Sequence, residues 1–139
     1  MKRILYSAML TLAVISCITA HAQAINNNLI GSWRLIYSKG KDGGNSFSAD
    51  SSSRYQAKVI TSTRFVLTAY SPQGDTLYMT FEGPITVSGN TYTETIQKSS
   101  VKEMLGMTYK YTSTVTGNKW RIEGGGNGLE LEEEWIRID

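Results

Sequence analysis

The feature that most restricts the fold of this chain is an alternation of side chains with a period of two. In the segment 30–38, Trp33, Leu35 and Tyr37 fall on one face of an extended backbone. Successive side chains of a strand point to opposite faces, so this spacing predicts half-buried β-strands. No long stretch repeats its apolar residues with the 3.6-residue period of an amphipathic helix. We therefore expect an all-β chain.

Eight such segments follow one another, and residues typical of turns separate them. Gly89-Asn90 and Gly117-Asn118 are two-residue hairpin signals, and Pro72 lies in a third turn. A polar stretch, 39–53, is expected to be a loop, and "GGGNG" (124–128) is expected to be a flexible turn rather than a phosphate loop. The predicted strands are 30–38, 54–61, 64–71, 76–88, 91–98, 107–116, 119–124 and 129–138.

One helical element is expected, between the fifth and sixth strands. Ser100 and Glu103 have the spacing of a capping box, and Gly106 is suited to end the helix. The predicted fold class is thus all-β, an eight-stranded up-and-down antiparallel barrel with one short helix. Closure removes the unpaired strand edges of an open sheet. A two-sheet sandwich is the alternative.

In a barrel of this kind, alternate connections lie at opposite ends. The stretches 39–53, 71–75, the short helix and 124–128 would then share one end, which is rich in loops. The short connections 61–63, 89–90 and 117–118 would share the other. Met79, Met104 and Met107 are expected near the loop-rich end, either as an adaptable apolar mouth or as ordinary packing.

Residues 1–22 have the pattern of a secretory signal peptide. Lys2 and Arg3 precede an apolar run, and Ala20-His21-Ala22 makes a cleavage site. We predict cleavage after Ala22, a barrel domain at 23–139, and a secreted or periplasmic location. The alternative is a lipoprotein, because the residues before Cys17 resemble a lipobox. We expect association with a membrane only if Cys17 is lipidated.

Cleavage would remove Cys17 and His21, which are the single cysteine and the single histidine of the chain. Zinc sites of Cys and His, haem ligation by His and catalytic triads with His are then excluded. Loss of Lys2 and Arg3 would also leave equal numbers of basic and acidic residues, which argues against a nucleic-acid partner. We expect no cofactor, no metal and no catalytic residue; the oligomeric state stays open.

The inward faces of the predicted strands suggest a cavity lined by aromatic and apolar side chains, which would hold a small hydrophobic ligand. The alternative is a barrel filled by its own side chains, in a structural or interaction protein of the cell envelope. Both occur in barrels of eight strands. The candidate ligand-binding residues are Tyr37, Leu67, Met79, Glu94, Ile96, Tyr109, Tyr111 and Leu131.

Two acidic residues, Glu94 and Glu133, are predicted to face inward, with Arg137 as the single base there. One acid would pair with Arg137, and the other needs a tyrosine hydroxyl (Tyr109 or Tyr111), water or a ligand group. A third class of function, an enzyme, would have to use Glu94 or Glu133 as its acid or base. The neighbouring Glu130, Glu132 and Glu134 should point outward toward Lys119 and Arg121, with calcium binding as the alternative.

Gly31-x-Trp33 at the start of the first strand, with Arg137 near the end of the last, resembles the lipocalin and calycin pattern. The run from "KVITSTRF" through "GNTYTE" to "EEWIR" is similar to small secreted bacterial lipocalin-like proteins of unknown function, over residues 29–138. The resemblance implies a barrel that holds a small apolar molecule in its open end. Gly31, Trp33 and Arg137 match the structural signature of that family. The alternation of connections independently places Trp33 at the narrow end of the barrel as a floor plug, with Trp135 and Arg137 of the last strand expected beside it as structural residues. The second lipocalin motif, Thr-Asp-Tyr, is absent.

Overall fold

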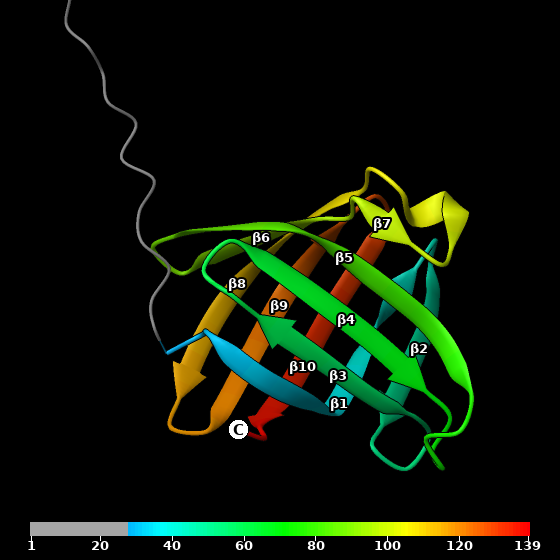
Figure 1. Cartoon of the computed structure of the whole chain (residues 1–139). Helices are drawn as coiled ribbons and strands as arrows, with labels where there is room; N and C mark the ends of the chain where they lie inside the picture. Colours follow the sequence, from blue (N-terminus) through cyan, green and yellow to red (C-terminus); the bar gives the residue numbers. More distant parts are fainter. Residues whose placement is uncertain (1–27) are drawn as a thin grey trace, which may run out of the picture.

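The computed structural model describes residues 28–139, so the predicted signal peptide lies outside the described residues. Antiparallel strands wrap around a single core in chain order (Figure 1). A single 3-10 turn, Lys102–Met104, accompanies them. The strands are β1 (Gly31–Asp42), β2 (Asn45–Asp50), β3 (Tyr55–Ile60), β4 (Arg64–Tyr70), β5 (Leu77–Ser88), β6 (Thr91–Thr95), β7 (Lys98–Ser99), β8 (Thr108–Thr116), β9 (Lys119–Gly126) and β10 (Leu129–Arg137).

The sheet is a closed barrel. Each main strand pairs with its neighbour in the order β1, β3, β4, β5, β6, β8, β9 and β10, and β10 returns to pair with β1. Trp33 lies opposite Arg137 and Asp42 lies opposite Leu129, so this last pairing runs along the whole of β1. The predicted eight-stranded up-and-down antiparallel barrel is confirmed, and the sandwich alternative is wrong.

The two short strands extend the barrel wall at its loop-rich end. β2 pairs with residues 37–42 of β1, while β3 pairs with residues 31–34 on the same edge. The prediction that residues 39–53 form a polar loop is therefore wrong, because most of this segment forms a β-hairpin. The turn of the hairpin contains Gly43 and Gly44, which both have positive φ angles. Backbone pairing needs no apolar side chain, so a polar strand leaves little signal in the sequence. In the same way, β7 pairs with β5 beyond the end of β6.

The predicted helix between the fifth and sixth strands is also wrong, since only the 3-10 turn forms there. Its N-cap residue is Val101, which has no side chain able to cap. The Ser100 hydroxyl, expected to cap a helix, instead accepts a hydrogen bond of 2.9 Å from the Thr80 backbone N–H. Without a side-chain cap for the first turn, the segment does not continue as an α-helix.

The three consecutive glycines at 124–126 belong to β9 and not to a turn, which corrects the prediction for 124–128. Their φ angles are 147°, 152° and 157°, values that only glycine adopts readily. A Cβ on Gly125 would lie 2.0 Å from the Leu129 carbonyl oxygen, and one on Gly124 would lie 2.3 Å from that of Lys110. The turn itself is Asn127-Gly128. These glycines therefore allow β8, β9 and β10 to pack closely.

The core is densest at the end of the barrel with the short connections. Trp33, Trp120 and Trp135 have no exposed surface there, and the Trp33 and Trp120 ring centroids lie 5.5 Å apart. The guanidinium carbon of Arg137 lies 4.3 Å from the centroid of the Trp33 ring. Arg137 also donates hydrogen bonds to the backbone carbonyls of Ile30 and Asn28. This aromatic layer, called the floor below, closes one end of the barrel.

Gly31 is required by the floor. An added Cβ would lie 2.1 Å from Nη1 of Arg137, and the φ angle of Gly31 is 142°. A side chain at this position would displace the guanidinium from Trp33.

No helix among the described residues is long and apolar enough to span a membrane.

Candidate functional site

Above the floor, the barrel encloses a cavity of about 490 Å³ that opens at the loop-rich end. Strands β1, β2, β3, β4, β5, β6, β8 and β10 contribute to its wall, together with the segment that contains the 3-10 turn. The apolar part of the lining consists of Phe47, Leu67, Met79, Phe81, Ile96, Val101, Met104, Met107, Leu129 and Leu131. The polar part consists of Ser38, Asp42, Arg54, Gln56, Lys58, Glu94, Tyr109, Tyr111, Asn127 and Glu133.

Seven of the eight candidate residues lie in this lining, and their role in binding stays a prediction. They are Leu67, Met79, Glu94, Ile96, Tyr109, Tyr111 and Leu131. The prediction that Tyr37 faces inward is wrong, because Tyr37 is 39% exposed. The pairing of β1 with β10 shifts between Leu35 and Tyr37. This bulge inserts one residue and reverses the facing of all later side chains, so Ser38 points inward instead.

Lys58 is the main residue that the sequence interpretation missed. In the segment 54–61, Tyr55, Ala57 and Val59 share one face, so the period-two pattern favours that face as the inward one. The other face carries Gln56, Lys58 and Ile60. Val59 is exposed, whereas Lys58 is buried with 1% of its surface accessible. One signal was present. Lys58 lies opposite Leu67 across the β3–β4 hairpin, and directly paired residues share a face of the sheet.

The ammonium group of Lys58 lies at the bottom of the cavity, where it pairs with Glu94. Lys58 Nζ is 3.1 Å from Glu94 Oε2, and the Tyr92 hydroxyl donates a hydrogen bond of 2.9 Å to the same oxygen. Four rings surround the ammonium at 5.0 to 5.9 Å, those of Trp135, Trp120, Phe65 and Tyr92. Glu94 is thus satisfied by Lys58 and Tyr92, not by the Arg137, Tyr109 or Tyr111 expected from sequence. Cation–π contacts help to offset the cost of burying this pair.

The second inward acid, Glu133, has no such partner. Its side chain is buried, and it accepts a hydrogen bond of 3.0 Å from Trp135 Nε1. Burial raises the pKa of Glu133, and the charge of Glu94 adds to this, while Lys58 and Arg54 act in the opposite direction. The expected pairing with Arg137 is wrong, because Arg137 lies below the floor and contacts Asp139. The carboxyl group of Glu133 is therefore a polar group in the cavity wall that forms no ion pair with the described residues.

The acidic run on β10 points away from the cavity, as predicted. Arg121 lies 2.8 Å from Glu132, and Lys119 lies 3.2 Å from Glu134. Lys39 of β1 also contacts Glu132, at 2.9 Å. Cross-strand ion pairs therefore account for this run. Within residues 28–139, no group of three or more His, Cys, Asp or Glu side chains is arranged to hold a metal ion.

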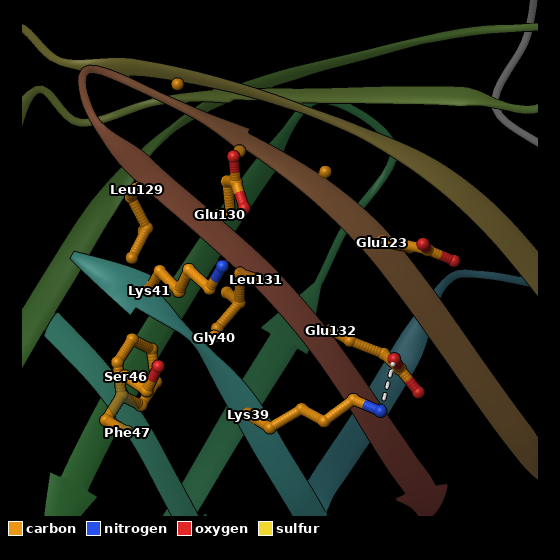
Figure 2. A pocket seen from close by; sticks show the side chains of 13 residues that line it. Lys39, Gly40, Lys41, Ser46, Phe47, Glu123, Leu129, Glu130, Leu131 and Glu132 are labelled. Carbon is orange, nitrogen blue, oxygen red and sulfur yellow. Dashed lines mark ion pairs between the residues drawn. The ribbon is translucent and has the colours of Figure 1, made fainter. Parts of the chain in front are cut away.

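A second, open hollow of about 710 Å³ lies over β1, β2, β9 and β10 (Figure 2). Gly40 and the glycines 124–126 leave the backbone bare there, and Lys39 and Glu132 pair at its rim. It shares Phe47, Leu129 and Leu131 with the barrel cavity. Its charged side chains are largely in contact with solvent, whereas the buried charges all line the interior. The interior cavity is therefore the better candidate site.

Comparisons with known proteins agree with this architecture. A lipocalin-like protein from Bacteroides uniformis superposes with a TM-score of 0.52 at 15% identity, over 80% of this chain and 99% of that one. An uncharacterized protein from Bacteroides eggerthii superposes with a TM-score of 0.51 at 13% identity, over 78% and 98%. No family model and no curated protein matches the sequence. At these identities the likeness shows the fold alone, which is a lipocalin-like β-barrel.

Proposed function

We propose that this lipocalin-like barrel binds a small apolar molecule in its open end and catalyses no reaction. The observation that supports this most directly is the cavity of about 490 Å³ above the aromatic floor. Pockets for small molecules typically measure about 300 to 1,000 Å³ and are mostly apolar with a few polar groups. The alternative from sequence, a barrel filled by its own side chains, would leave no volume of this size.

The open end of the barrel is lined by methionine side chains that can adapt to ligands of different shapes. Met79, Met104 and Met107 line the cavity there, and the Tyr109 hydroxyl donates to the sulfur of Met107 at 3.0 Å. Methionine side chains are flexible and polarizable, so they fit ligands of different shapes. This supports a binding role for the open end.

The chemistry of the inward acids favours binding over catalysis. A general base needs an accessible carboxylate within reach of a substrate proton. Glu94 is already engaged by Lys58 and by Tyr92. Glu133 is buried against Trp135. Neither residue has a histidine or cysteine beside it, since residues 28–139 contain none.

Titration with a neutral apolar fluorophore, N-phenyl-1-naphthylamine, tests the proposal. We expect saturable binding with one probe per barrel. Met79→Trp, which fills the cavity, should weaken binding at least about tenfold. The matched control, Val66→Trp, adds the same ring to an exposed position on β4 and should leave the affinity unchanged. Absence of saturable binding to the wild type, or equal losses in both variants, would contradict the proposal.

The proposed location is the periplasm or the exterior of the cell. It rests on the pattern Ala20-His21-Ala22 after an apolar run. The intact mass of the protein recovered from cells tests it. A mature chain that begins at Gln23 is expected, whereas a diacylglyceryl adduct on Cys17 would establish the lipoprotein alternative.

A further inference from the structure

Two buried polar atoms in the wall of the cavity have no hydrogen-bond partner among the described residues. They are Oγ of Ser38 and Nε of Arg54. Ser38 has no exposed surface, and both residues line the cavity. A buried polar atom without a partner costs about 1 to 3 kcal/mol, so nearly all such atoms in native proteins are paired. A partner supplied by a bound molecule would remove this cost.

Three chain segments bring polar groups to this position. The bulge in β1 turns Ser38 inward, where it lies directly opposite Glu133 of β10. Arg54 precedes β3 and is close enough for its charge to act on the carboxyl group of Glu133. A hydroxyl, a guanidinium and a carboxyl group therefore face the same part of the cavity.

Two donors without partners select the kind of group that fits. The acids of the cavity lining are Asp42, Glu94 and Glu133, and its bases are Arg54 and Lys58. Lys58 is already paired with Glu94, whereas Arg54 forms no ion pair and no side-chain hydrogen bond with residues 28–139. Arg54 Nε–H and the Ser38 hydroxyl can both donate. A negatively charged acceptor is the complement of two such donors, and hydrogen bonds between charged groups are the strongest of this type.

We propose that Ser38, Arg54 and Glu133 form a subsite for a compact anionic head group, such as a carboxylate, on an amphiphilic ligand. The apolar part of the ligand lies against the methionines contributed by β5 and by the segment 101–107. This inference rests on the proposed function and adds to it the chemistry of one end of the ligand.

Glu133 takes part by binding a proton. Burial and the charge of Glu94 already favour its protonated form, against Lys58 and Arg54. Burial also raises the pKa values of Tyr92 and Tyr111, so these neighbours stay neutral. An anionic head group beside Glu133 raises the pKa of this carboxyl group further, and the protonated carboxyl then donates a third hydrogen bond. Binding takes up a proton, so affinity falls as the pH rises.

Three ligands with one chain and different head groups provide the test: decanoate, decanol and decylammonium. Each displaces N-phenyl-1-naphthylamine from the wild-type protein in a competition titration. We expect decanoate to bind at least about tenfold more tightly than decanol, and decylammonium to bind most weakly. Equal affinities, or a preference for decylammonium, would overturn the anionic subsite while leaving the proposed function intact. If neither the fluorophore nor any of the three ligands binds, both the anionic subsite and the proposed function are overturned.

Variants locate the subsite. Arg54→Met keeps an unbranched apolar stem but removes the guanidinium, and should remove the preference for decanoate while changing decanol affinity less than about twofold. Lys110→Met removes one positive charge from an exposed position on β8 and serves as the control. Glu133→Gln should flatten the fall of decanoate affinity with rising pH, because the variant has no carboxyl group to take up a proton. An unchanged decanoate preference in Arg54→Met would overturn the assignment.

Discussion

The two ends of the barrel are made of the same strands but are filled differently. At the floor, Trp33, Trp120 and Trp135 are completely buried, and the connections between strands are short. At the open end, Met79, Met104 and Met107 are only partly buried and surround a cavity. The strand pairing alone thus does not decide whether a barrel is filled or hollow. The size of the inward side chains and the length of the connections decide it.

The difference also separates stability from binding. Large rings packed against one another contribute most of the apolar area that folding removes from water. Flexible side chains beside a cavity contribute less, because part of their surface stays accessible. We therefore expect substitutions at the floor to reduce stability, and those at the open end to change affinity.

The largest effect is expected for Trp33→Ala. Trp33 packs on Trp120, stacks against the guanidinium of Arg137, and donates a hydrogen bond of 2.9 Å to the Leu29 carbonyl. Loss of a buried tryptophan typically costs about 3 to 5 kcal/mol of unfolding free energy. Denaturant melts measure this cost, and Tyr78→Ala, at an exposed aromatic position, is the control. A wild-type midpoint for Trp33→Ala would show that the floor is dispensable.

Glu94→Gln is expected to follow closely, at about 3 kcal/mol. The variant leaves the ammonium of Lys58 buried without a counter-charge, which is the usual cause of a large loss. The double variant Lys58→Met, Glu94→Leu should recover most of the stability because no buried charge remains. Denaturant melts of both proteins are the measurement. If the single and double variants lose the same unfolding free energy, the loss does not come from an unpaired buried charge, and the ion pair itself stabilises the fold.

Arg137→Ala should cost less, about 1 to 2 kcal/mol, because the guanidinium is partly exposed. The loss includes its contact with Trp33 and the hydrogen bonds to two carbonyls near the start of β1. Arg121→Ala removes an arginine whose ion pair with Glu132 is exposed, and should cost less than about 1 kcal/mol. Similar melts for the two variants would show that stacking on Trp33 adds nothing.

The smallest loss of stability is expected at the open end. Met104→Ala should reduce the unfolding free energy by less than about 1 kcal/mol, since Met104 is only half-buried. Its effect on the affinity for N-phenyl-1-naphthylamine should be several-fold, because the cavity loses an apolar contact. A loss as large as that of Trp33→Ala would erase the distinction between the two ends.

The sequence predicted the barrel and most inward residues because one face of most of the long strands is clearly apolar. Leu67, Ile96, Tyr109 and Tyr111, which were candidate lining residues, all face inward as expected. It failed where the period-two pattern is interrupted or ambiguous. One extra residue in β1 reversed the facing of Tyr37.

At β3 the period-two pattern pointed to the wrong face, because the buried side chains there are Gln56, Lys58 and Ile60. The pairing of Lys58 with Leu67 across the β3–β4 hairpin is the signal that would have placed Lys58 inside. The glycines of β9 were mistaken for a turn, because close backbone approach leaves no pattern in neighbouring side chains.

The pairing of β1 with β10 has a consequence for the order in which this protein folds. Arg137 donates to the Ile30 carbonyl across 107 residues of chain. Contacts between residues so distant in sequence require the closure of a long loop, which is entropically costly and slows folding. The fully buried aromatic floor therefore depends on β10, the strand of the barrel that lies farthest along the chain. Until β10 has emerged, the chain has neither a closed barrel nor a complete floor, however well its local hairpins have formed.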